Sequence, residues 1–186
     1  MSGNLFLIRH GETDWSASGR HTSFTDLDLN EAGLEAAEKL RARLAGDTFG
    51  QVLTSPRLRA RKTAAIAGFP DANVDDDLAE WNYGEYEGVT TAEIRKTVPD
   101  WTIWTHSCPG GETAGQVGAR LDRVVARARS VEGDTAVFAH GHSLRALAAR
   151  WLGLPVSEGR LFDLDTATIS VLGFERETAV VLRWNT

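Results

Sequence analysis

Three short polar segments carry residue types that suit the handling of a phosphate group. They are RHG at 9–11, SPRLR at 55–59 and HGH at 140–142, and each follows an apolar run. Arginine provides forked N–H donors that match phosphate oxygens, and a neutral histidine is a competent nucleophile near pH 7. Glycine lets the backbone approach an anion closely. Together these residue types fit a phosphoryl group whose negative charge is spread over its oxygens.

The apolar runs in front of these segments predict strands of one sheet. Residues 5–8, 52–53 and 135–139 are typical of buried strands, and residues 167–174 and 179–184 predict a closing β-hairpin. Because the first strands alternate with helices, we expect an α/β fold with a mostly parallel sheet and an antiparallel edge. Ligands bind beyond the carboxyl ends of the strands in such sheets, so the three polar segments should meet at one edge.

Capping residues between the strands predict where helices begin. Asn30, Thr90 and Thr113 are the expected N-caps, and the last two begin capping boxes. Pro56 is expected to open the helix after the second strand, and Ser143 is expected to cap the helix after the strand at 135–139. The positive N-terminal ends of these two helices would then point at a bound anion.

Length, composition and charge bound the class of protein. The chain has 186 residues, of which 42% are hydrophobic and 25% are charged, so we expect one globular domain over 1–186. A net charge of −6 argues against a general nucleic-acid binder, because such proteins need a basic face. The N-terminus does not resemble a signal peptide, and no apolar run is long enough to span a bilayer. We therefore expect a cytoplasmic protein that binds neither nucleic acid nor membranes.

A proton donor for a leaving group is expected in the acidic and aromatic stretch 75–87. A carboxyl group in a desolvated aromatic pocket can protonate a leaving oxygen. Glu80 is the best candidate, because it lies beside Trp81 and close to Tyr83. Most other carboxylates of this stretch are expected on a solvated acidic face.

Four stretches of the sequence resemble the histidine phosphatase superfamily, the phosphoglycerate-mutase-like proteins. They are LIRHGET at 7–13, TSPRLRARKTA at 54–64, LAEWNYGEYEG at 78–88 and FAHGHSLRAL at 138–147, in the order that the family shows. The resemblance implies a three-layer α/β/α sandwich and a phosphohistidine intermediate, with no metal and no cofactor. The residue spacing itself predicts no metal site, and the single cysteine excludes a four-cysteine zinc site.

The resemblance also implies roles for particular residues. Five are expected to be catalytic: Arg9, His10, Arg59, Glu80 and His140. His10 would be the phosphorylated nucleophile, Glu80 the proton donor, and the other three would surround the phosphate. Arg59 matches the family's arginine better than Arg57, because it directly precedes Ala60. Six further residues are expected to contact substrate: Ser16, Thr22, Ser23, Tyr83, Gly141 and His142. Ser16 stands where many relatives carry asparagine, which shortens one contact with the phosphate.

A phosphatase is expected, with a cofactor-dependent phosphoglycerate mutase as the alternative within the family. Mutases grip a carboxylated substrate with additional arginines and a longer insertion after the third motif. Here Trp81 stands where the mutase has an arginine, and segment 88–112 is short, with only Arg95 and Lys96 as basic residues. EWNYGEYEG and CPGGET resemble relatives that hydrolyse phosphorylated sugars. The expected substrate is therefore a small phosphomonoester, a sugar phosphate or bisphosphate.

Two further functions are weighed against the phosphatase. A non-catalytic module that binds a phosphorylated ligand is disfavoured, because every expected catalytic residue type is present. A protein phosphatase that acts on phosphohistidine is disfavoured too, because such relatives are shorter and typically lack the motif around Glu80. The closing hairpin offers an edge strand that could pair between two subunits, so a homodimer is also considered.

Overall fold

The sheet contains six strands in the described part of the chain. In the computed structural model, which describes residues 2–186, the strand order is β3-β2-β4-β1-β5-β6. The strands are β1 (Ser2–Arg9), β2 (Phe49–Thr54), β3 (Asn73–Val74), β4 (Gly133–Ala139), β5 (Ile169–Glu175) and β6 (Thr178–Arg183). The first four run parallel, whereas β5 pairs antiparallel with both β1 and β6. This confirms the predicted α/β fold, with a mostly parallel sheet and an antiparallel edge.

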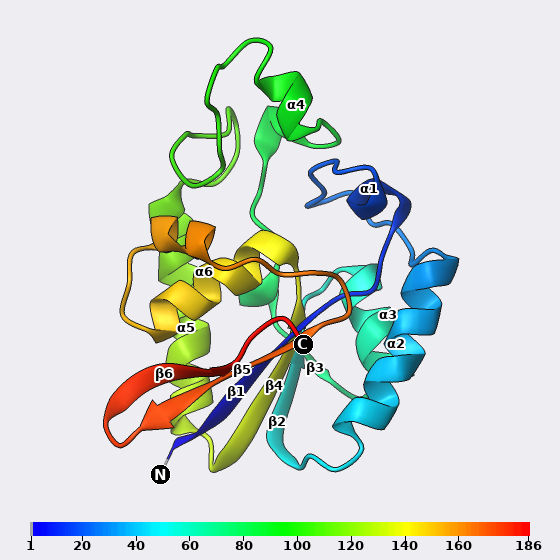
Figure 1. Ribbon diagram of the computed structural model, residues 1–186, viewed down its shortest axis with the longest axis vertical. Coiled ribbons are helices and arrows are strands. Elements are labelled where there is room, and N and C mark those ends of the chain that lie inside the picture. The colour runs from blue at the N-terminus through cyan, green and yellow to red at the C-terminus, as the bar shows by residue number, and fades with distance from the viewer. Residues whose placement is uncertain (1) are drawn as a thin grey trace.

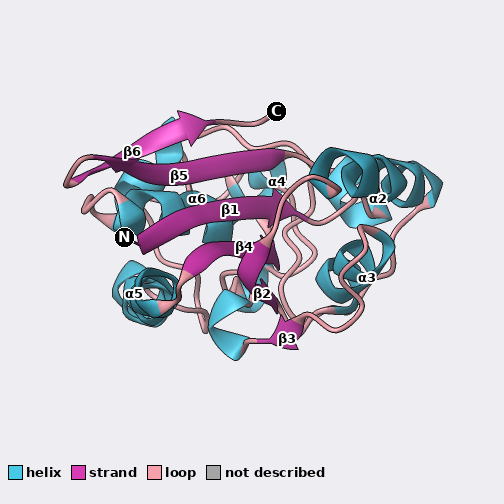
Figure 2. Cartoon of the chain, turned by 90° about the horizontal axis from the view of Figure 1, so that it is seen from below, coloured by secondary structure: helices cyan, strands magenta, loops and turns pink. Residues whose placement is uncertain are grey.

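Helices cover both faces of this sheet and complete a three-layer α/β/α sandwich (Figure 2). On one face lie α2 (Glu31–Leu44) and α3 (Leu58–Ile66), and on the other lie α5 (Ala114–Ser130) and α6 (Gly141–Trp151). The short helices α1 (Asp14–Ala17) and α4 (Thr91–Ile94) lie beyond the carboxyl edge of the parallel strands (Figure 1). Three 3-10 segments complete the elements: η1 (Asp76–Leu78), η2 (Gly84–Tyr86) and η3 (Val156–Leu161). Among the helices described, none is both long and apolar enough to cross a membrane.

The alternation of side chains along β1 divides the core between the two faces. Leu5 and Leu7 belong to the cluster that includes side chains of α5 and α6. Phe6 and Ile8 belong to the cluster that includes side chains of α2 and α3. Successive strand residues point to opposite faces, so a fully apolar strand is needed where helices cover both sides. This burial fixes β1, and with it the position of the residues that follow it.

Most predicted helix boundaries are confirmed, and two are wrong. Asn30 caps α2, and capping boxes at Thr90 and Thr113 begin α4 and α5. However, α3 begins at Leu58, so Pro56 lies outside it. Helix α6 begins at Gly141, with His140 rather than the predicted Ser143 at the N-cap, and neither helix has a side-chain cap. The first N–H groups of α6 are instead left to bond the side chain of another residue, and that residue belongs to the candidate site.

Candidate active site

The three polar segments predicted to meet do meet at the carboxyl edge of the sheet. His10 directly follows β1 and its N–H donates to the carbonyl of Ala139, the last residue of β4 (3.0 Å). Ser55 directly follows β2 and its N–H donates to Phe138 O (2.9 Å). The parallel ladder of β1, β4 and β2 therefore brings residues far apart in sequence side by side.

The ring of His10 is buried and held in one orientation. Its Nδ1 lies 2.7 Å from the carbonyl of Gly11, so this nitrogen carries the proton and donates it. The other nitrogen, Nε2, is unprotonated, and its lone pair accepts a hydrogen bond from Arg59 Nε at 3.3 Å. Position 11 requires glycine, because a Cβ there would lie 2.5 Å from the carbonyl of Gly33. This geometry presents Nε2 as the reactive atom.

His140 lies against His10 with one nitrogen free. The two ring centroids are 5.1 Å apart. His140 Nε2 lies 2.7 Å from the hydroxyl oxygen of Ser55, whereas the buried Nδ1 has no partner within the described residues. A buried polar atom without a partner is costly, so His140 Nδ1 is available for a ligand.

Arg59 provides a buried guanidinium group and Arg9 a partly buried one. Arg59 Nη2 donates to Thr22 O (2.9 Å) and Nη1 to Thr25 O (3.2 Å), which ties the loop after α1 to α3. Arg9 Nη1 donates to Leu164 O (2.5 Å), and its buried Nε has no partner in the described part of the chain. Burial lowers the pKa of both arginines, yet an arginine stays protonated in proteins. Both therefore remain cations beside His10.

These cations and the burial keep the two histidines neutral. Burial, and next the charge of Arg59, hold the pKa of His10 well below its usual value of 6.5. The same two causes lower the pKa of His140. A neutral imidazole is the form that can attack phosphorus, so His10 stays competent as a nucleophile in mildly acidic solution.

Glu80 takes the place of the missing cap of α6. Its Oε1 accepts N–H bonds from Trp81 and Ser143 (2.8 Å each), and its Oε2 accepts one from His142 (3.1 Å). The positive end of a helix favours a carboxylate at this position. Of these three backbone bonds, Oε1 accepts two and Oε2 accepts one.

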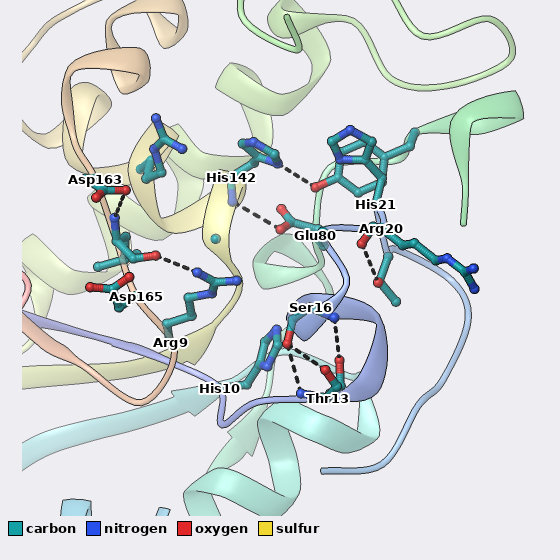
Figure 3. A pocket seen from close by; sticks show the side chains of 16 residues that line it. Arg9, His10, Thr13, Ser16, Arg20, His21, Glu80, His142, Asp163 and Asp165 are labelled. Carbon is teal, nitrogen blue, oxygen red and sulfur yellow. Dashed lines mark hydrogen bonds between the residues drawn. The ribbon is translucent and has the colours of Figure 1, made fainter. Parts of the chain in front are cut away.

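A pocket of about 270 Å³ opens where His10 and Glu80 meet (Figure 3). Besides Arg9, His10 and Glu80, its lining includes five of the residues predicted to contact substrate: Ser16, Thr22, Tyr83, Gly141 and His142. Arg59 and His140 are buried against His10 and do not line it. Ser16 Oγ donates to Thr13 O (3.0 Å) and accepts from Thr13 N–H (2.9 Å) in the capping box of α1.

Of the six residues predicted to contact substrate, Ser23 is the one that lies outside this lining. Its hydroxyl donates to the Glu80 carbonyl (3.3 Å), and its N–H donates to the carboxylate of Glu87 (2.9 Å). Ser23 is almost fully buried. It therefore stands behind Glu80 and supports the loop rather than facing the pocket.

Five charged or ionisable residues of the lining were not predicted: Arg20, His21, Arg145, Asp163 and Asp165. Arg145 belongs to the fourth motif and stacks over the ring of Trp104 (4.8 Å). His21 packs against Tyr83 with ring centroids 4.7 Å apart, and Tyr83 Oη lies 2.6 Å from His142 Nδ1. The two aspartates lie in the loop after η3, so a distant part of the sequence brings them to the pocket (Figure 3). No local sequence pattern marks them, because only the fold brings them there.

The family assignment rests on a match over nearly the whole chain. The family model described as "Histidine phosphatase superfamily (branch 1)" matches residues 5–186. The chain belongs to the histidine phosphatase superfamily. This confirms the resemblance carried by the four sequence motifs, and the chain is a phosphatase.

Two relatives and one solved structure resemble this histidine phosphatase closely. An acid phosphatase of Mycobacterium tuberculosis is 44% identical, over 95% of this chain and 91% of the relative. A sedoheptulose 1,7-bisphosphatase of Saccharomyces cerevisiae is 41% identical, over 85% of this chain and 70% of the relative. A solved structure of the open reading frame Rv3214 from Mycobacterium tuberculosis superimposes with a TM-score of 0.92, at 42% identity, over 100% of this chain and 98% of that one.

This histidine phosphatase is expected to lose stability in mildly acidic solution. Burial lowers the pKa of His21 to about 4, and burial also holds the pKa values of His10, His140 and His142 well below 6.5. Between pH 6.5 and 4 the unfolded chain binds a proton at His21 and the folded chain does not, and the other three histidines act in the same direction below pH 6.5. The free energy of unfolding therefore falls as the pH falls, by up to about 1.4 kcal/mol per pH unit for each histidine.

Urea unfolding between pH 7 and 5 tests this expectation with two variants. In His21→Gln the decline should be less steep by up to about 1.4 kcal/mol per pH unit. The matched control is His106→Gln, because His106 is an exposed histidine, and its decline should equal that of the wild type. A stability that rises toward pH 5, or an unaltered slope in His21→Gln, would contradict the argument.

Proposed function

We propose that the protein is a metal-independent phosphomonoesterase that forms a phosphohistidine at His10 and acts on a sugar phosphate or sugar bisphosphate. The observation that carries the proposal is the unprotonated Nε2 of a neutral, oriented His10, with Arg59 Nε at 3.3 Å and Glu80 at the same pocket. Nucleophile, Arg9 and proton donor thus line one small pocket, and Arg59 lies directly against the nucleophile. That set is what phosphoryl transfer requires.

In the first step, His10 Nε2 attacks phosphorus in line with the ester oxygen. The lone pair of Nε2 forms the P–N bond while the P–O bond to the alcohol breaks, and the leaving oxygen takes the proton from Glu80 Oε2. Arg9 and Arg59 stabilise the charge on the transferred oxygens. If Ser55 donates its hydroxyl proton to His140 Nε2, then Nδ1 carries a proton and donates it to the phosphoryl group, which satisfies its unpartnered position.

In the second step, water attacks the phosphohistidine from the side that the alcohol has left. Glu80, now a carboxylate, accepts a proton from that water, and the P–N bond breaks with its electron pair returning to His10 Nε2. Inorganic phosphate leaves, and Glu80 is again protonated for the next turnover. The three backbone N–H groups that hold Glu80 keep its carboxyl group in one place through both steps.

Support for a small sugar phosphate comes from the pocket and from the relatives. A volume of about 270 Å³ suits a small metabolite. Around the phosphate site the lining offers both cations, Arg20 and Arg145, and carboxylates, Asp163 and Asp165, which match the donors and acceptors of a polyol. Of the two relatives, the sedoheptulose 1,7-bisphosphatase agrees with this substrate class, and the acid phosphatase agrees with a phosphatase reaction.

The pocket lacks the arginine that a mutase carries directly after the glutamate. Trp81, which stands where a mutase carries an arginine, is buried and donates its ring N–H to Glu112 O (3.0 Å). It does not line the pocket. A carboxylated substrate therefore finds no positive side chain at that position.

Phosphate release from a substrate panel tests the proposal. The panel contains glucose 6-phosphate, fructose 1,6-bisphosphate, sedoheptulose 1,7-bisphosphate, 3-phosphoglycerate and p-nitrophenyl phosphate, with and without EDTA. We expect release from at least one sugar phosphate and the same rate in EDTA. Conversion of 3-phosphoglycerate to its 2-isomer without net release would favour the mutase, and ligand binding without any turnover would favour a binding module.

A cytoplasmic location and a homodimer stay predictions. Strand β6 forms one edge of the sheet, with Val181 and Leu182 exposed, which leaves backbone groups free for pairing. Size-exclusion chromatography with light scattering distinguishes monomer from dimer.

A further inference from the structure

An ion pair outside the pocket, between the buried Arg120 and the partly exposed Glu112, holds the chain on both sides of Glu80. Arg120 of α5 is only 8% exposed. Its Nη1 donates to the carbonyls of Asp77 (2.7 Å) and Ala79 (2.8 Å). Its Nε and Nη2 donate to the two carboxylate oxygens of Glu112 (2.8 and 3.1 Å). Four hydrogen bonds therefore occupy a guanidinium that has five N–H groups.

Glu112 holds the residues that follow Glu80. Its Oε2 accepts the N–H of Asn82 (2.9 Å), and its own N–H donates to the carbonyl of Asn82 (2.9 Å). Its carbonyl accepts the ring N–H of Trp81 (3.0 Å). The two chain segments touch closely, because a Cβ at Gly111 would lie 2.3 Å from Asn82 O. Segment 80–82 is therefore fixed to Glu112 through backbone and side chain together.

These contacts place Glu80 between two supports. Arg120 binds the carbonyl of Ala79, which belongs to the peptide bond leading into Glu80, and Glu112 binds the two residues after it. The carboxylate itself is held at the first turn of α6. Neither Arg120 nor Glu112 lines the pocket. Any effect of the pair on the reaction must therefore pass through the segment that it holds, in which Glu80 and Tyr83 line the pocket.

We propose that the Arg120–Glu112 pair is a positioning device that keeps Glu80 where it can pass a proton to the leaving oxygen. This inference rests on the proposed function, in which Glu80 is the proton donor. A rigid, bidentate arginine–carboxylate pair sets geometry as well as adding energy, and small displacements of a catalytic group cost rate. The pair therefore lies outside the pocket lining, with Arg120 on helix α5 and Glu112 on the loop that precedes it.

The test compares two leaving groups, because a misplaced proton donor harms them unequally. A sugar alkoxide needs a proton as it leaves, whereas p-nitrophenolate is a stable anion that leaves without one. The substrates are p-nitrophenyl phosphate and the sugar phosphate that the panel shows to be fastest. The measured quantity is kcat/KM, because it reports the steps up to transfer of the phosphoryl group to His10 and excludes the later hydrolysis.

Two variants weaken the ion pair, and two others serve as the reference and the control. Glu112→Gln keeps the shape of the side chain but removes the charge and one acceptor. The double variant Glu112→Gln/Arg120→Met removes the pair without leaving a single buried charge, so that it has a better chance of folding. Glu80→Gln shows the pattern of a lost proton donor. Asp122→Asn is the matched control, because it breaks an exposed ion pair of the same helix, to Arg150 (2.7 Å).

We expect kcat/KM for the sugar phosphate to fall about tenfold or more in both pair variants, and for p-nitrophenyl phosphate by less than about threefold. Glu80→Gln should show the same imbalance, larger, and Asp122→Asn should match the wild type. An equal loss for both substrates would assign the pair a merely structural role and overturn the inference. So would an imbalance in Glu80→Gln that the pair variants lack. If Glu80→Gln itself shows no imbalance, the proposed role of Glu80 fails first and the inference fails with it.

Discussion

His10→Ala is expected to abolish turnover, with kcat/KM falling on the order of 10⁴-fold or more for every substrate. The variant removes the atom to which phosphorus is transferred, and no other side chain can replace it. His140 is adjacent, with ring centroids 5.1 Å apart, but in the proposed mechanism its Nε2 accepts from Ser55 and its Nδ1 carries the proton, so neither nitrogen offers a lone pair to phosphorus. Arg9, Arg59 and the Glu80 carboxyl group remain, so the variant should still bind a phosphate ester.

Rapid quenching with labelled substrate separates a lost nucleophile from a lost fold. The wild type should carry an acid-labile label on His10 during turnover, and His10→Ala should carry none while keeping the wild-type thermal transition within a few degrees. His106→Ala is the control, because it removes an exposed histidine and leaves the site intact. Substantial hydrolysis by His10→Ala, or a label that persists in it, would exclude the phosphohistidine mechanism.

The meeting of the three polar segments could be predicted because buried parallel strands of one sheet have their carboxyl ends at the same edge. Apolar runs mark β1 and β4, and a residue that directly follows a parallel strand must lie at the carboxyl edge. The choice of Arg59 over Arg57 came from the motif, and the structure places Arg59 at 3.3 Å from His10 Nε2, with Arg57 over the ring of Phe24 instead. Local pattern and tertiary position agree at these residues.

The wrong prediction at Ser143 and the missed residues lie where a contact between distant segments, rather than a local sequence pattern, determines the structure. Ser143 looks like an N-cap, yet the carboxylate of Glu80, 63 residues away in the chain, binds its N–H. Asp163 reaches the pocket from the loop after η3, and Arg120 sits in an otherwise ordinary amphipathic helix. Charged residues on a helix usually face solvent. Nothing in the spacing of Arg120 shows that four of its N–H groups are bound in the interior.

Arg59→Met is expected to lower kcat/KM by about 10³-fold, the second largest loss after that of the nucleophile. Methionine fills a similar volume but gives no donor to the phosphate, and it frees Thr22 O and Thr25 O, which Arg59 binds. The charge of Arg59 also helps to hold the pKa of His10 down. The pKa of His10 should therefore rise in the variant, so that protonation inactivates the nucleophile at a higher pH than in the wild type.

Arg57→Met provides the matched control on the same segment. Arg57 is half-buried, packs over Phe24 at 5.0 Å, and makes no hydrogen bond to His10 within the described residues, so its variant should keep kcat/KM within about threefold of the wild type. Nitrogen-detected NMR of the His10 ring between pH 7 and 5 should show earlier protonation in Arg59→Met and no change in Arg57→Met.

Equal losses in the two variants would mean that the net positive charge of the segment, rather than the placement of one guanidinium against His10, supports the reaction. The position of Arg59 is specific because its Nε and Nη groups bind His10 and the 22–25 loop at once, and an arginine two residues earlier on the chain cannot reproduce that geometry.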